Sequence, residues 1–273
     1  MLILQKIMRN VRYISISLLL VLGALIVGCS GYETILESNN PTLKYKKAFD
    51  YFESEEYSKS STLFEQLVPI YKGTEKAPKI QFFYGKSLYQ QRKYVLASYH
   101  FQQTAQNYPE SEYSVDAMFL KGMCYYQLSP EYRLDQKYTK KAITVFNNFI
   151  KQYPSHSKAK ECRDILNNLH NKLAKKAFHN AKLYYELEDY EAALVAFNNC
   201  LEEYPKSKYR EKIKFLLVKS NYLLAKHSVQ EKQRKRYQNT IDNYYSFINE
   251  FEDSEYLSEA KKIYDKSKHI LEN

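Results

Sequence analysis

The hydrophobic positions of the chain follow two different patterns. Residues 14–27 form one mainly apolar run, preceded by three positive side chains, Lys6, Arg9 and Arg12. From residue 41 onward, small and aromatic residues instead recur three or four positions apart among charged ones. Residues at these spacings share one face of an α-helix. The pattern therefore predicts a short leader followed by a succession of amphipathic helices.

A repeated motif punctuates the helical part of the chain. Three segments contain an alanine, a phenylalanine four residues later and a proline eight residues after that: Ala97/Phe101/Pro109, Ala142/Phe146/Pro154 and Ala193/Phe197/Pro205. The alanine lets a neighbouring helix approach closely, and the proline ends the helix because it lacks an N–H and clashes with the preceding turn. A second small residue precedes each segment, with a leucine or tyrosine three positions later: Gly85/Leu88, Gly122/Tyr125 and Ala181/Tyr184. This combination is typical of tetratricopeptide (TPR) repeats.

The repeats predict an all-α fold, a TPR-like solenoid of helical hairpins with about five repeats. Two units are degenerate: Ala48, Tyr51, Ser60 and Phe64 mark the first, and Ser220, Thr240, Tyr244 and Phe251 mark the fifth. The segment SPEYRLDQ, 129–136, predicts an insertion between the helices of the third repeat, and a similar insertion is expected in the fifth. A C-terminal capping helix is expected at about 254–271, because terminal repeats need a polar outer face. We group residues 41–157 as repeats 1–3 and residues 158–273 as repeats 4–5 with the cap.

Composition supports a helical fold with a basic surface. The 273 residues include 28 tyrosines and 14 phenylalanines, but only 6 glycines and 7 prolines, which argues against an all-β fold. The formal net charge is +10. The three basic residues of the leader account for +3, so the rest of the chain carries +7. A moderately basic surface suits acidic partners, anionic headgroups or nucleic acid.

The leader has the features of an export signal. Its apolar run is shorter than the roughly 20 residues that a membrane-spanning helix needs, and it ends in small residues, as in a secretory signal peptide. Residues Ile26–Cys29 also resemble the bacterial lipobox, which implies cleavage before Cys29 and lipid on its thiol and amine. An ordinary signal peptide with an incidental cysteine is the alternative. The lipobox predicts a signal peptide at 1–28, a lipidated tether at 29–40 and, by analogy through Ser30, an outer-membrane anchor on the periplasmic side.

Aromatic residues of the first helices are expected to line the inner surface of the array. One row comprises Tyr45, Phe82, Phe119 and Phe178, a second comprises Phe52, Tyr89, Tyr126 and Tyr185, and Lys86 and Lys182 lie between them. Such rows suit an extended, partly apolar peptide. The alternative is that many of these rings pack against one another as core.

The sequence contains no pattern typical of catalysis or metal binding. The six histidines form no H-x-x-x-H or H-E-x-x-H motif, no C-x-x-C occurs, and the few glycines leave no phosphate-binding loop. We therefore expect no enzyme activity, no metal and no cofactor beyond lipid on Cys29. Cys124 and Cys200 are expected to be buried small side chains, and the three cysteines after Cys29 leave at least one unpaired. The basic segment 232–236 favours a solvated helix face or an acidic partner, because export argues against nucleic acid.

Taken together, the lipobox, the repeats and the boundaries YPESEY (108–113) and YPKSKY (204–209) resemble the BamD family, the lipoproteins of the β-barrel assembly machinery. The segment 41–67 also resembles the first repeat of that family. The resemblance implies a non-enzymatic scaffold at the outer membrane. Its N-terminal repeats would receive unfolded outer-membrane proteins, here at Tyr45, Phe52, Phe82, Lys86 and Tyr89. Its C-terminal repeats would dock on the periplasmic domains of a BamA-like barrel insertase, here with Lys232, Arg234, Lys235 and Arg236.

The same architecture also fits another class of protein. A TPR lipoprotein could serve cell-wall synthesis or division, or form a glycan-binding component of the outer membrane. The protein that co-purifies from solubilised outer membranes distinguishes these functions.

Overall fold

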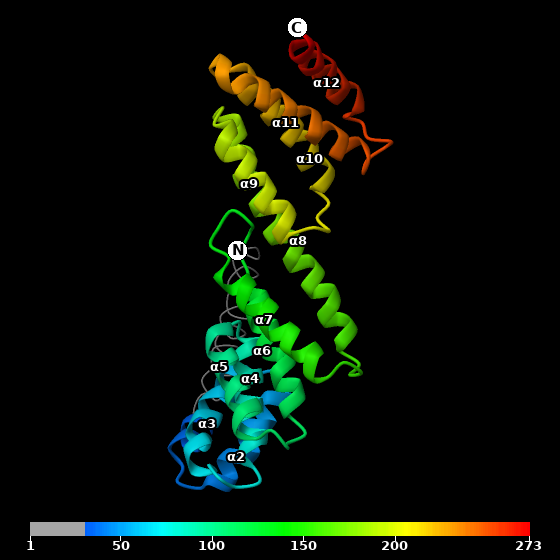
Figure 1. Cartoon of the computed structure of the whole chain (residues 1–273). Coiled ribbons are helices and arrows are strands. Elements are labelled where there is room, and N and C mark those ends of the chain that lie inside the picture. Colours follow the sequence, from blue (N-terminus) through cyan, green and yellow to red (C-terminus); the bar gives the residue numbers. More distant parts are fainter. Residues whose placement is uncertain (1–30) are drawn as a thin grey trace, which may run out of the picture. The chain divides into compact units, whose positions relative to one another are not determined.

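A computed structural model describes residues 31–273, and all regular structure in this part of the chain is helical. Contacts divide the chain into two compact units, the first ending at Leu128 and the second beginning at Ser129. The helices of the first unit, labelled in Figure 1, are α2 (Pro41–Glu53), α3 (Tyr57–Ile70), α4 (Ala77–Gln90), α5 (Tyr94–Asn107) and α6 (Ser114–Leu128). The signal peptide at 1–28 and Cys29 lie outside the described residues, so cleavage and lipidation stay predictions.

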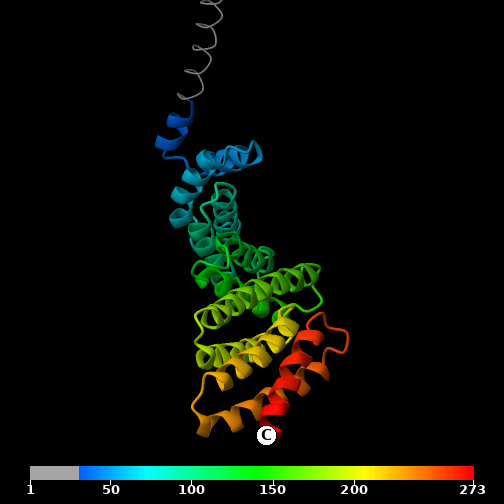
Figure 2. The ribbon, with the colours of Figure 1, turned by 90° about the horizontal axis from the view of Figure 1, so that it is seen from above.

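The second unit contains the longest helix of the described chain. Its helices are α7 (Lys137–Gln152), α8 (Ala159–Glu186), α9 (Tyr190–Glu203), α10 (Arg210–Lys226), α11 (Gln230–Ile248) and α12 (Leu257–Glu272). From α8 to α11 each helix packs against the next in chain order, and α12 packs on α10 and α11 (Figure 2).

The order of helices confirms the predicted all-α fold. Eleven helices follow one another from α2 to α12, and α12 packs on α10 and α11 as the last helix of the chain. The insertion at 129–136 is also confirmed, since it connects α6 to α7, and the division between the units falls at its start. This division lies inside the third repeat, whereas the functional grouping into residues 41–157 and 158–273 stays a prediction.

The prediction of an insertion between the helices of the fifth repeat is wrong. Only residues 227–229 connect α10 to α11. The stretch from α10 through α11 contains no glycine or proline, so the extra residues lengthen the two helices instead of forming a loop.

The prolines of the repeats end helices as expected. Tyr108, Tyr153 and Tyr204 each precede a proline, and each closes its helix with φ between −129° and −134°. A residue before proline is pushed out of the helical region by the proline ring, which explains these three stops.

The turns inside three repeats share a left-handed residue that is not glycine. Glu55, Arg92 and Glu188 have φ of 60–61°. After α4, the N–H of Arg92 donates to the carbonyl of Tyr89, and the N–H of Lys93 donates to the carbonyl of Leu88. These two bonds define a Schellman motif, which satisfies the last carbonyls of the helix.

The repeated alanine and phenylalanine positions form the core. Ala97, Phe101, Ala142, Phe146, Ala193 and Phe197 are all fully buried. Gly85 lies so close to α5 that a Cβ at this position would come within 2.9 Å of the Phe101 ring. The small residue is therefore required by the close approach of α4 and α5.

The second tyrosine of each YPxSxY boundary packs on an aromatic residue one repeat earlier. The Tyr113 ring lies 5.1 Å from Phe82 in the first unit, and the Tyr209 ring stacks 4.6 Å from Phe178 in the second, with an angle of 10° between the rings. The boundary motif thus ends one helix and contributes an aromatic contact to the core.

Part of the expected tether is folded. Residues 31–37 are helical, and Tyr32, Ile35 and Leu36 pack against the core of the first unit. The Tyr32 ring meets Tyr51 edge-on at 5.6 Å. The chain therefore joins the first unit within a few residues of Cys29.

Candidate functional site

Aromatic rings of α2 and lysines of α4 form a mixed surface in the first unit, which we call the ring–lysine surface. Its members are Tyr45, Phe49 and Phe52 from α2, Phe83, Lys79 and Lys86 from α4, and Lys76 at the α4 N-cap. The Lys86 ammonium lies 5.2 Å from the Phe52 ring centroid and 5.1 Å from that of Phe83. Lys79 lies 4.7 Å from Phe49, and Lys76 lies 5.0 Å from Tyr45.

Helical spacing explains why these side chains meet. Tyr45, Phe49 and Phe52 are separated by four and three residues, and so are Lys79, Phe83 and Lys86 on the facing helix. Such spacing aligns each set along one helix face. Phe49 meets Phe83 at 5.0 Å and Phe52 meets Phe83 at 5.0 Å, so the rings form a continuous apolar strip beneath the lysines.

The charge of this surface is available to a ligand. Within residues 31–273, none of Lys76, Lys79 and Lys86 forms an ion pair with a carboxylate. Burial raises the pKa of Tyr45, so its hydroxyl stays protonated and can donate a hydrogen bond. Partly buried rings beside unpaired ammonium groups suit a peptide with apolar side chains and a negative group.

The structure brings together three of the five residues expected at this end of the chain. Tyr45, Phe52 and Lys86 belong to the ring–lysine surface. Phe82 is only 5% exposed and packs on Phe101 and Tyr113, which corrects its expected exposure. Tyr89 is turned toward α5, where its ring lies 5.3 Å from Tyr94.

Phe49, Phe83, Lys76 and Lys79 were missed by the sequence analysis. Phe49 follows Tyr45 by four residues, so helical spacing alone could have identified it. Phe83 adjoins Phe82, and adjacent helical residues point about 100° apart, so one is core and the other surface. No sequence signal separates these two identical neighbours.

Several other residues expected to line an inner surface are either buried in the core or form an ion pair within their own helix. Phe119 and Phe178 are 5% and 6% exposed. Lys182 forms an ion pair with Glu186 one turn along α8. For Phe119 and Phe178, the core interpretation is therefore correct.

The basic segment of α11 does not present one continuous face. Lys232 shares a helix face with Lys235 and Arg236, three and four residues later, whereas Arg234 points to another side. Arg236 donates a hydrogen bond to Ser228 at 2.5 Å and lies 3.9 Å from Glu191 of α9. Lys232, Arg234 and Lys235 are exposed, so three of the four charges are accessible to a partner.

The remaining predictions concern thiols, metals and membrane spans. Cys124, Cys162 and Cys200 are buried free thiols, and burial raises their pKa to about 12, 11 and 11. Within residues 31–273, no three His, Cys, Asp or Glu side chains are arranged to hold a metal ion, and no helix is long and apolar enough to span a membrane. The absence of a metal and of a cofactor stays a prediction.

The chain matches one protein family over most of its length. The YfiO family, described as outer membrane lipoprotein, matches residues 37–235. The chain therefore belongs to this family of outer membrane lipoproteins, which confirms the resemblance to BamD seen in the sequence. No curated protein matches the chain significantly.

Solved structures with a similar helical arrangement are distant in sequence. A TPR-repeat protein from Bacteroides fragilis is 12% identical, with a TM-score of 0.41, over 85% of this chain and 100% of that one. The TPR domain of P58(IPK) is 11% identical, with a TM-score of 0.40, over 92% of this chain and 68% of that one.

Proposed function

We propose, from its membership of the YfiO family of outer membrane lipoproteins, that this protein is a lipid-anchored subunit of the β-barrel assembly machinery. It acts as a non-enzymatic scaffold on the periplasmic side of the outer membrane and requires no cofactor or metal. It receives unfolded outer-membrane proteins at one end and binds the barrel insertase with the other.

The ring–lysine surface is the observation that supports client binding. Unfolded barrel strands alternate apolar and polar side chains. A strip of partly buried rings can take the apolar side chains, while Lys79 and Lys86 attract a carboxylate. Since residues 31–37 pack on the same unit, a lipid on Cys29 holds this surface near the membrane where barrels insert.

The docking end is assigned to the second unit. Lys232, Arg234 and Lys235 are exposed on α11 and suit an acidic surface of a BamA-like insertase. Arg236 supports this segment from within, because it bonds to Ser228 and faces Glu191.

Co-purification after mild crosslinking tests the proposal. We expect a polytopic β-barrel protein to be recovered with the full chain from solubilised outer membranes. Recovery of peptidoglycan synthases without such a barrel protein would favour the cell-wall scaffold and contradict the proposal.

The anchor is tested by Cys29→Ser. We expect this variant to leave the membrane fraction, because stable anchoring requires covalently attached acyl chains. In the mature wild-type protein unfolded in urea, only the three buried thiols should titrate, since lipid blocks Cys29. A fourth reactive thiol, or a Cys29→Ser protein that stays with the outer membrane, contradicts lipidation.

A further inference from the structure

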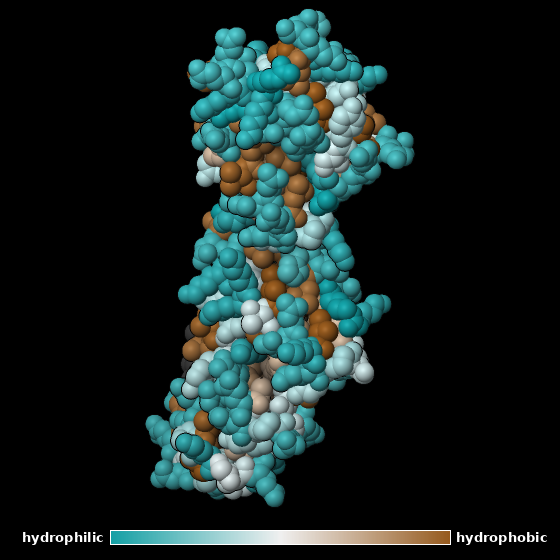
Figure 3. Space-filling model, in the orientation of Figure 1, coloured by the Kyte–Doolittle hydropathy of each residue, from teal (hydrophilic) through white to brown (hydrophobic). Residues whose placement is uncertain are grey.

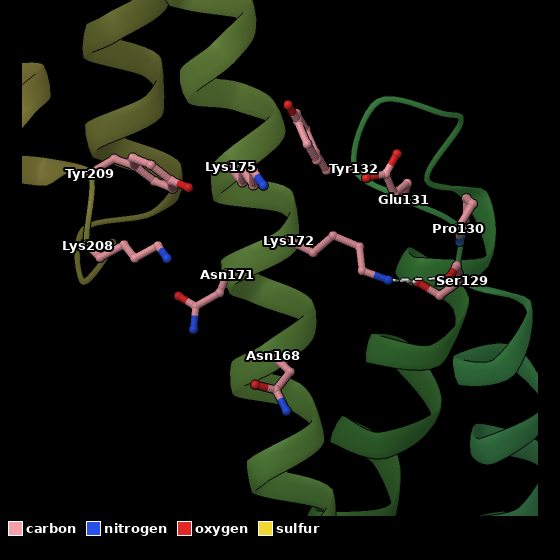
Figure 4. Close-up of a pocket in the computed structure, with 10 residues that line it drawn as sticks. All are labelled: Ser129, Pro130, Glu131, Tyr132, Asn168, Asn171, Lys172, Lys175, Lys208 and Tyr209. Atoms are coloured by element: carbon pink, nitrogen blue, oxygen red, sulfur yellow. Dashed lines mark hydrogen bonds between the residues drawn. The ribbon is translucent and has the colours of Figure 1, made fainter.

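A groove across α8 in the second unit combines positive charge with aromatic walls (Figure 4). Its volume is about 460 Å³, within the range of small-ligand and peptide sites. Lys172 and Lys175 project from α8, Tyr132 comes from the loop 129–136, and Lys208 and Tyr209 precede α10. The groove therefore draws on three segments that are distant in sequence.

The wall formed by residues 129–136 is held in place by hydrogen bonds. The Lys172 ammonium donates to the Ser129 hydroxyl at 2.7 Å, and the Lys176 ammonium donates to the Leu134 carbonyl at 2.6 Å. From inside the loop, buried Gln136 donates to the carbonyls of Glu131 and Leu134, at 2.8 and 2.9 Å. Because these hydrogen bonds already order the loop, it loses little conformational entropy when a ligand binds.

The opposite wall is also fixed. Tyr209 stacks on buried Phe178, which sets the orientation of its ring. On the facing side, the Lys175 ammonium lies 4.3 Å from the Tyr132 ring centroid. Figure 4 shows Lys175 between the two tyrosines, and Asn171 and Lys208 pointing into the same space.

The positive charge of the groove lacks an internal counterpart. Within the described chain, Lys172, Lys175 and Lys208 form no ion pair with a carboxylate. Lys172 bonds only to neutral oxygens of Ser129, and burial lowers its pKa. Glu131 is the one carboxylate that lines the groove, so positive charge is in excess. Such a site favours an anion.

The arrangement of charges and rings points to an acidic peptide. Three ammonium groups line the groove, that of Lys175 lies between the two tyrosines, and no lining residue is an arginine that could bind a phosphate with two parallel hydrogen bonds. An extended segment can place carboxylates on Lys175 and Lys208 and apolar side chains against the tyrosine rings, while Asn171 bonds to its backbone.

We propose that this groove binds an acidic peptide segment of a partner protein. Lys175 and Lys208 pair with its carboxylates, and Tyr132 and Tyr209, on either side of Lys175, contact its aromatic or aliphatic side chains. The inference does not depend on the barrel assembly function, because it holds for any partner that displays such a segment.

Fluorescence anisotropy with a defined peptide tests this site. The probe is a rhodamine-labelled peptide of alternating aspartate and phenylalanine, added to the full mature chain in non-ionic detergent. We expect Lys175→Gln and Lys208→Gln each to weaken binding about tenfold, because each removes a charge-assisted contact. The matched control, Lys160→Gln, lies exposed on the same helix and should leave binding unchanged. A peptide with asparagine in place of aspartate should bind about tenfold more weakly or worse.

Further variants separate charge from folding. Lys175→Arg should retain most of the binding, and circular dichroism should give the same melting temperature for all variants. Unchanged peptide binding in Lys175→Gln and Lys208→Gln overturns the proposal. It is also overturned if inorganic phosphate or vesicles of anionic phospholipid bind through these lysines more tightly than the peptide does.

Discussion

At the scale of single residues, the repeat motif is a set of packing constraints. Phe101 is fully buried, and its ring occupies the space that a side chain on Gly85 would need. The sequence alternates small and large residues on facing helices because the interior is packed to high density. Replacing Gly85 or Phe101 with a residue of another size therefore changes the distance between α4 and α5.

We expect Gly85→Ala to lower the free energy of unfolding. A Cβ 2.9 Å from the Phe101 ring forces α4 and α5 apart, at about 1–3 kcal/mol. Over most of this range the cost exceeds the gain of about 1 kcal/mol from the higher helix propensity of alanine. Urea unfolding followed by circular dichroism measures the change. Gly31→Ala is the matched control, because a Cβ there meets nothing within 4 Å. A Gly85→Ala protein as stable as wild type would contradict the close approach.

At the scale of helices, hydrogen bonds at the ends set the length of each element. The Schellman turn after α4 places Arg92 at φ 60°, a conformation that costs an L-residue about 1–2 kcal/mol. Glu55 and Glu188 occupy the equivalent positions in two other repeats. The turn is thus fixed by its hydrogen bonds and neighbouring helices, despite an unfavourable residue type.

Arg92→Gly should raise the free energy of unfolding by up to about 1 kcal/mol. Glycine adopts positive φ without steric penalty, although its more flexible unfolded chain offsets part of the gain. Lys140→Gly is the control, because Lys140 is exposed in the helical conformation inside α7, where glycine should lose stability instead. Equal losses in both variants, measured by urea unfolding, would show that strain at Arg92 is absent.

An ion-pair network connects α10 to Glu250 in the turn after α11. Arg210 donates two hydrogen bonds to Glu250, one of 3.0 Å from Nη2, and Lys214 lies 2.5 Å from the same carboxylate. The hydrogen bonds from Arg210, together with Lys214, lower the pKa of Glu250 from 4.5 to about 2. Because the folded-state pKa is lowered, the network stabilises the fold above pH 4.5, and this contribution is lost as the pH falls toward 2.

Glu250→Gln should therefore destabilise the protein in a pH-dependent manner. Since the Glu250 side chain is 32% exposed, we expect a loss of about 1 kcal/mol at pH 7. Near pH 2 the difference from wild type should vanish. Urea midpoints measured across this range report the effect, with exposed Glu252→Gln as the control. A constant difference at all pH values would exclude the network as its cause.

At the scale of the whole molecule, the two units carry different chemistry. The ring–lysine surface lies in the first unit, and the α8 groove and the α11 charges lie in the second. Exposed apolar side chains form interrupted patches among hydrophilic ones in the view of Figure 3. Recognition is thus expected at mixed sites that combine rings with charge.

The separation predicts that client binding and docking can be removed independently. Lys86→Gln should weaken crosslinking to an unfolded outer-membrane protein about three- to tenfold, because the ammonium over Phe52 and Phe83 is lost. Recovery of the barrel partner should be unchanged. The double variant Arg234→Gln/Lys235→Gln should lower recovery of the barrel partner and leave crosslinking to the unfolded protein unchanged. The control Lys93→Gln should change neither measurement. Loss of both activities in one folded variant would refute the division.

The sequence by itself determined the helices, their order and the family. Helical spacing, three proline stops and the repeated small residues are local signals, and they predicted five helix pairs with a cap. The lack of glycine and proline from α10 through α11 is also a local signal, and it favours two long helices. The repeat spacing was nevertheless interpreted there as an insertion.

Only the tertiary structure decided which aromatic residues form the surface. Phe82 is core because Phe101 of α5 and Tyr113 cover it, whereas its neighbour Phe83 points toward α2 and stays partly exposed. The groove on α8 likewise required Tyr132, Lys175 and Lys208 to converge from three separate segments. Residue type and spacing determine a helix face, whereas burial depends on neighbours that are distant in sequence.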